Sequence, residues 1–250
     1  METIKLRYQI SLFGNYDEIT PSSENMKFFI ENFSDKGLIP NQIRQLSIDM
    51  TSKEPSSKTD LRLNLTDSDK KWDVKFNSNR IDIVFLNSNI GVIKEISKED
   101  FLKEAIDLLN RINQKFNKSH KKLGFVFQYL IDSTDIFNDS KLFLNSIDYF
   151  NEKSMSDWSS RVATRSKLTY NDNHEEIVNV ISEARRINQP MNIKNNFALF
   201  EGVFINIDIN TLSENQNYRF QFENLNSIFN EMSKIEASII NQIAQKFRPK

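Results

Sequence analysis

Alternation of apolar and polar residues is the feature that most constrains the fold of this chain. From Ile4 to Leu12 every second residue is apolar, and the same period returns at 46–50, 61–65, 72–76 and 81–85. A two-residue period is typical of strands that bury one face. Turn residues separate several of these segments, which predicts an antiparallel meander with one apolar face.

Two long segments repeat their apolar residues every three or four positions and are predicted to be helices. The first covers 98–118 and begins at a capping box formed by Ser97 and Asp100. The second covers 223–247 and is expected to bury Phe229, Met232, Ile235, Ile239 and Ile243.

Further strands are expected at 123–131, 157–170, 199–209 and 218–222. Residues 175–187 fit either a strand or a helix, and Pro190 is expected to end that element. Gly202 is predicted to form a bulge in its strand.

This order predicts an α+β protein of two similar lobes, each an antiparallel β-meander packed by a long amphipathic helix. The N-terminal lobe would comprise residues 1–133 and the C-terminal lobe residues 157–250, with a connector at 134–156. The two long helices occupy matching places after their strands. The sequence does not decide whether this reflects a true duplication.

Composition excludes several kinds of chemistry. The 250 residues include no cysteine, so there is no disulfide, thiolate zinc site or cysteine nucleophile. The 5 glycines are widely separated and form no phosphate-binding loop, and the 2 histidines cannot build a histidine-rich metal centre. We therefore expect neither a cofactor nor a metal.

The chain carries no signal for a membrane. No apolar run approaches ~18 residues, and the N-terminal residues alternate where a signal peptide would be uniformly apolar. The expected location is the cytoplasm. The net charge is −1, and residues 150–250 contain 12 basic and 12 acidic side chains, without the basic excess of typical nucleic-acid domains.

Asp60, Asp73 and Lys75 form a pattern that approaches a metal-dependent nuclease site. Such sites use an acid on one strand and an acid-x-Lys pair on the next, so that carboxylates hold Mg²⁺ and lysine steadies the attacking water. Asp73 and Lys75 also lie on the side opposite the apolar residues of their strand. A solvated strand face is the favoured interpretation.

A cluster of cations is the candidate binding site. Alternation places Arg161, Arg165 and Lys167 on one side of a strand, and Arg185 and Arg186 lie on a possible neighbour. This surface would bind nucleic acid or an acidic protein. The alternative is a solvated face whose cations are neutralised by Glu175, Glu176 and Glu183.

His120 lies among four lysines between residues 115 and 122, where a helix is expected to end. The helix dipole favours cations at this end. The alternative is a contact with a small anion or with nucleic acid.

The layout resembles an uncharacterised family of sporadically distributed, two-lobed bacterial proteins. The similarity lies in the apolar strand Leu123–Tyr129 after the first long helix, and in the long helix 223–247 at the end of the second lobe. The resemblance implies the two-lobed fold and no activity.

We expect a non-enzymatic cytoplasmic protein that binds another protein as an adaptor or inhibitor, and a homo-oligomer is compatible with the sequence. The composition and the scattered occurrence of the similar family suggest a role in phage–host or toxin–antitoxin conflict. The alternatives are nucleic-acid binding through Arg161, Arg165 and Lys167, and a Mg²⁺-dependent nuclease.

Overall fold

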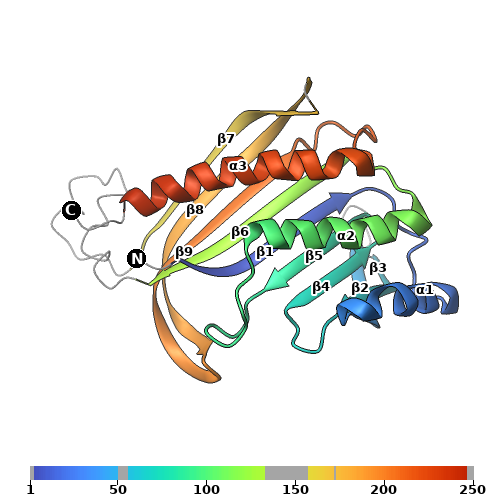
Figure 1. The fold of residues 1–250 in the computed structure, drawn as a ribbon, viewed down its shortest axis with the longest axis horizontal. Coiled ribbons are helices and arrows are strands. Elements are labelled where there is room, and N and C mark those ends of the chain that lie inside the picture. The colour runs from blue at the N-terminus through green and yellow to red at the C-terminus, as the bar shows by residue number, and fades with distance from the viewer. Residues whose placement is uncertain (1–2, 50–55, 133–156, 172, 247–250) are drawn as a thin grey trace.

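The computed structural model describes residues 3–49, 56–132, 157–171 and 173–246. The strands in these ranges form one nine-stranded antiparallel sheet in the order β2-β3-β4-β5-β1-β6-β9-β8-β7 (Figure 1). Their bounds are β1 Thr3–Phe13, β2 Ile39–Asp49, β3 Ser56–Thr66, β4 Trp72–Asn77, β5 Arg80–Leu86, β6 Lys122–Asp132, β7 Ser159–Tyr170, β8 His174–Ile193 and β9 Asn196–Thr211.

In the same ranges, three α-helices pack on one face of this sheet (Figure 1). They are α1 Ser23–Phe33, α2 Lys98–Phe116 and α3 Phe222–Lys246, and a short 3₁₀ turn, η1 Ser34–Lys36, follows α1. The apolar side chains of alternate strand positions meet the apolar stripes of the helices there. The resulting main core is rich in aromatic rings, including the fully buried Phe125, Phe127 and Phe229.

The predicted helices are confirmed, with small shifts at their ends. The Ser97 hydroxyl accepts from the backbone N–H of Asp100 at 2.9 Å, so the predicted N-cap of α2 is in place. α2 ends at Phe116, because Asn117 takes a left-handed backbone conformation with φ 41°. In α3, Phe229, Met232 and Ile243 are buried, whereas Ile235 and Ile239 are partly buried.

The structure does not confirm a division into two lobes. β6 belongs to the predicted N-terminal lobe and pairs in continuous register with β9 of the predicted C-terminal lobe, from Gly124–Asn210 to Asp132–Gly202. The main core also draws residues from both parts of the chain. The proposed connector, 134–156, lies outside the described residues. The coarser prediction of an α+β fold with antiparallel strands holds.

Three local predictions were wrong. Pro190 does not end its element, because β8 continues through it to Ile193; of the two interpretations left open for residues 175–187, the strand holds. The predicted strand at 218–222 is absent from the described structure, where Phe220 makes an isolated bridge to His120 and α3 begins at Phe222. Gly202 keeps the regular register of β9. A Cβ there would lie 2.5 Å from the Ile131 carbonyl oxygen, so the glycine permits a close backbone approach.

β8 and β9 extend beyond the sheet as a two-stranded arm, residues 187–201 (Figure 1). The described pairing of β7 with β8 ends at Arg185, and that of β6 with β9 ends at Gly202. Within the arm the two strands pair with each other, and residues 194–195 turn between them. One side of the arm packs on a second apolar cluster that contains Leu6, Ile90, Leu130, Ile187 and Phe200.

No helix in the described ranges combines the length and apolar character needed to cross a membrane.

Candidate interaction surface

The predicted basic surface is partly assembled. Strand pairing places Arg161 opposite Glu183 and Ser159 opposite Arg185. Because Val178, Val180 and Ala184 of β8 point into the main core, the odd-numbered residues of β8 point away from the helices. Arg161, Arg165, Lys167 and Arg185 therefore share the face without helices, whereas Arg186 lies on the opposite face of β8.

Carboxylates accompany these cations. Arg165 contacts Glu214 at 2.8 Å, Lys167 contacts Glu175 at 2.5 Å, and Arg185 lies 3.7 Å from Glu183. Arg186 forms its ion pair with Glu201 at 2.5 Å. Exposed pairs of this kind contribute little to stability. They do lower the positive potential that a phosphate backbone would meet.

The three residues of the nuclease pattern do not come together. Lys75 forms an ion pair with Asp73 of its own strand at 2.9 Å. Asp73 lies opposite Thr66 of β3, and Asp60 is six residues farther along β3, or about 20 Å at the rise of an extended strand. Within the described residues, no group of three His, Asp or Glu side chains could hold a metal ion.

His120 is a buried residue and does not take part in a basic surface. Its Nδ1 lies 2.7 Å from the Tyr16 hydroxyl, and burial lowers the pKa of the imidazole from 6.5 to about 4. The ring is therefore neutral at pH 7 and adds no positive charge to the lysines at the helix end. Two of the four lysines at this end are paired with acids, Lys115 with Glu24 and Lys118 with Glu18. The other two, Lys121 and Lys122, lie over aromatic rings.

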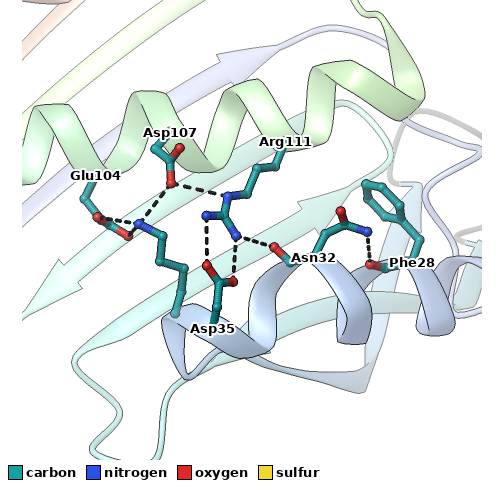
Figure 2. A network of polar contacts seen from close by, with 7 residues as sticks. Phe28, Asn32, Asp35, Glu104, Asp107 and Arg111 are labelled. Atoms are coloured by element: carbon teal, nitrogen blue, oxygen red, sulfur yellow. Dashed lines mark hydrogen bonds and ion pairs between the residues drawn. The ribbon is translucent and has the colours of Figure 1, made fainter.

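A network of ion pairs joins η1 to α2 (Figure 2). Arg111 binds both carboxylate oxygens of Asp35 at 2.6 and 2.9 Å, and Lys36 bridges Glu104 and Asp107 at 2.8 and 2.9 Å. The hydrogen bonds from Arg111 lower the pKa of Asp35, and the hydrogen bond to Glu104 raises the pKa of Lys36. These contacts hold η1 against α2. Every charge in the network has an opposite charge beside it.

A second polar cluster links α2, α3 and β6. Glu236 of α3 is only 1% exposed, and its two carboxylate oxygens accept from Lys98 and from the Tyr129 hydroxyl, each at 2.6 Å. Burial raises the pKa of Tyr129, so the phenol stays protonated and can donate. Lys98 also lines an open groove of about 1050 Å³ between α2 and α3. Its walls carry charges of both signs, among them Lys103, Glu231 and Lys234.

The outer side of the arm is different, because it exposes large apolar side chains. Phe197 is 85% exposed and Leu199 is 68% exposed, the highest values among the large apolar side chains of the described residues. Pro190 lies directly opposite Leu199 on the paired strand and is also exposed. The three side chains form the outer apolar patch of the arm.

The arm itself is held in a fixed place. The Ile90 N–H donates to the Asn192 carbonyl at 3.0 Å, and the Lys194 N–H donates to the Ile90 carbonyl at 2.8 Å. The Asn89 and Asn195 side chains add a contact at 2.7 Å. Together with the second apolar cluster, these bonds fix both the tip and the inner side of the arm against the sheet.

Comparisons with known proteins found no match: no family model, no curated protein and no solved structure is similar enough to this chain to be recognised. The resemblance in layout to an uncharacterised family therefore stays a prediction.

Sequence reasoning missed the arm because Pro190 was treated as the end of an element. One signal was available, the asparagine at position 195, because asparagine is favoured in the two-residue turns that connect paired strands. In the structure Lys194 and Asn195 form this turn, with φ values of 51° and 64°. Placing a hairpin at this turn would have paired Pro190 with Leu199 and put Phe197 on the same face as both.

Proposed function

We propose that this chain is a non-enzymatic binding protein that acts through contacts with another protein, and that the outer apolar patch of the arm makes the contact. The exposure of Phe197 and Leu199 is the observation that carries the proposal. Neighbouring exposed apolar side chains often mark interaction sites, and aromatic anchors contribute much of the energy in protein interfaces.

The way in which the arm is held supports this role. The second apolar cluster and the bonds to Ile90 fix the backbone that presents Phe197 and Leu199. A partner that binds a fixed surface does not have to order it, so more of the contact energy appears as affinity.

The nucleic-acid alternative has weaker support. Arg165, Lys167 and Arg185 each lie within ion-pair distance of a carboxylate, and the chain as a whole carries a net charge of −1. Strong binding to phosphates relies on an excess of cations that release counterions. The nuclease alternative requires Asp60 beside Asp73, which the register of β3 and β4 separates.

The cellular setting is also part of this proposal. The cysteine-free composition suits a reducing cytoplasm. The resemblance in layout suggests a role in phage–host or toxin–antitoxin conflict, so the partner is to be sought in host cells with and without phage challenge.

Site-specific photo-crosslinking tests the proposal. A benzophenone amino acid at position 197 should crosslink a discrete protein other than this chain in host cells. The matched control carries it at Tyr218, an aromatic residue that is 46% exposed outside the arm. Loss of the crosslinked product on adding Leu199→Ser is the expected confirmation. Equal products from positions 197 and 218, or none from position 197, would refute the role of the arm.

A further inference from the structure

We propose that a second copy of this chain pairs with the arm, so that the free edges of two β9 strands join antiparallel about a two-fold axis at Ala198. This inference rests on the proposed function of the arm and names its first partner. It follows from the direction of the backbone groups, the register and the distribution of charge along the edges of the sheet.

The hydrogen bonds at the tip show which backbone groups point outward. The Asn192 carbonyl accepts from the Ile90 N–H, and the Lys194 N–H donates to the Ile90 carbonyl. Ile90 lies on the side of β8 away from β9, so the even-numbered residues of β8 in the arm direct their backbone groups away from β9. Pro190, which has no N–H, occupies one of these even positions.

The odd-numbered residues of β8 therefore bond β9. Gln189 and Met191 face Phe200 and Ala198, so the even-numbered residues of β9 use their backbone groups toward β8. The N–H and C=O groups of Phe197 and Leu199 must then point to the outer edge of the arm.

In the described part of the chain, no strand pairs with this edge between residues 196 and 201. The same two residues thus combine exposed apolar side chains with backbone donors and acceptors directed outward. An added strand would bond these backbone groups and place its own side chains beside Phe197 and Leu199.

The sequence of the edge is self-complementary in one register. With the two-fold axis at Ala198, Phe197 of one copy faces Leu199 of the other, and both residues have outward backbone groups that can exchange hydrogen bonds. Asn195 then faces Glu201 of the second copy. No like charges oppose each other, and this interface is isologous, as a two-fold axis requires.

The other two outer strands are protected against such pairing. On β7, a two-fold axis at any residue from 163 to 166 would place cations among Arg161, Arg165 and Lys167 opposite or next to one another. On β2, Pro40 lacks a donor and Arg44 adds a charge. Charges and prolines at sheet edges are common devices against edge-to-edge association. From Asn196 to Phe200, the edge of β9 has neither.

Pairing through the edge leaves the outer side chains available to a further partner. Phe197 and Leu199 of both copies would lie side by side on one face of the joined sheet, because directly opposed residues of paired strands share a face. The dimer would therefore present an apolar strip twice as long as that of one arm, and this strip is the surface proposed above to bind another protein.

A single cysteine tests the register directly, since the natural chain has none. At the two-fold axis, residue 198 would face its own copy in a pair without mutual hydrogen bonds, with Cα atoms about 4.5 Å apart, within reach of a disulfide. Ala198→Cys should form a disulfide-linked dimer under mild oxidation. Ala163→Cys, an exposed alanine on the β7 edge, is the matched control and should stay monomeric.

Sedimentation equilibrium of the unmodified chain supplies an independent measurement. We expect a mass about twice 29.4 kDa, and we expect Leu199→Pro to restore the monomer. Leu199 directs its N–H outward, so this proline removes a donor from the free edge and none from the β8–β9 ladder.

The outcomes separate the two proposals. A monomer at all concentrations, or a disulfide through position 163 and not 198, would overturn pairing with a second copy. If such a monomer still crosslinks a different protein from position 197, the proposed function stands alone. A dimer linked through position 198 with no crosslink to any other protein supports the pairing and refutes the wider binding function.

Discussion

The main core and the arm use the same alternating pattern of apolar residues and bury it to different degrees. In β9, Val203, Ile205 and Ile207 point toward the helices and are fully buried. Phe197 and Leu199 continue the same side of the same strand, yet they are exposed. Figure 1 shows the reason, since the described helices lie over the sheet and none of them lies over the arm. An apolar period therefore defines a face, and only the neighbouring elements decide whether that face is core or interface.

The largest expected effect is the loss of a ring from the main core. Phe229 is fully buried in α3, and its ring packs edge-to-face on Phe125 with centroids 5.6 Å apart. Phe229→Ala should lower the free energy of unfolding by about 3–5 kcal/mol. Urea denaturation measures this change. Ile235→Ala, at a partly buried position of the same helix, is the control, and we expect a loss of about 1–2 kcal/mol from it.

Equal losses from these two changes would mean that α3 is not packed on the sheet as the structure describes. A loss below about 1 kcal/mol from Phe229→Ala would show that the cavity collapses, and that the main core tolerates the loss of a ring about as well as the outer side of the arm.

Local features of the fold could be predicted from the sequence. The strand at 3–13, the capping box at Ser97 and the stripes of both long helices depend on residues close together in the chain. The periods of two and of three to four residues carry that information directly. The α+β class follows from their order.

Features that depend on distant residues could not be predicted. The single sheet requires β6 to pair with β9, some 80 residues later in the chain, and the free side of the arm depends on where the helices end. The candidate cations were placed on one face correctly, except Arg186, but their partners came from elsewhere, as Glu214 does for Arg165. A pattern identifies a charge and does not identify what neutralises it.

The next effect concerns the buried ion pair that holds the helices together. Lys98→Met would leave the carboxylate of Glu236 buried without its cation. We expect a loss of about 3–4 kcal/mol, because an unpaired buried charge is strongly unfavourable. Adding Glu236→Gln should recover much of this loss, since the amide carries no charge. Denaturation of both single variants and the double variant measures the coupling. Strictly additive losses would show that Lys98 and Glu236 do not stabilise each other.

The buried His120 makes the stability of the folded protein sensitive to acid. Its pKa is about 4 in the folded protein and about 6.5 when exposed, so the unfolded chain binds more protons between these values. Stability should therefore decrease as the pH falls from about 6.5 to about 4, by up to roughly 3 kcal/mol. Unfolding free energies across this range measure the slope. His120→Gln should flatten it, and an unchanged slope in that variant would mean that the carboxylates alone produce the acid sensitivity.

The smallest effect on stability is expected at the outer side of the arm. Phe197→Ser removes a ring that stays largely exposed to water in the folded protein. The free energy of unfolding should therefore change by no more than about 0.5 kcal/mol. Phe200→Ser, on the buried inner side of the same strand, should be clearly more destabilising and should accelerate amide exchange within residues 187–201. Denaturation and hydrogen exchange of the two variants measure the contrast between the sides of one hairpin. A large loss from Phe197→Ser would mean that the outer face is already covered within the single chain, and that the ring stabilises the fold instead of waiting for a partner.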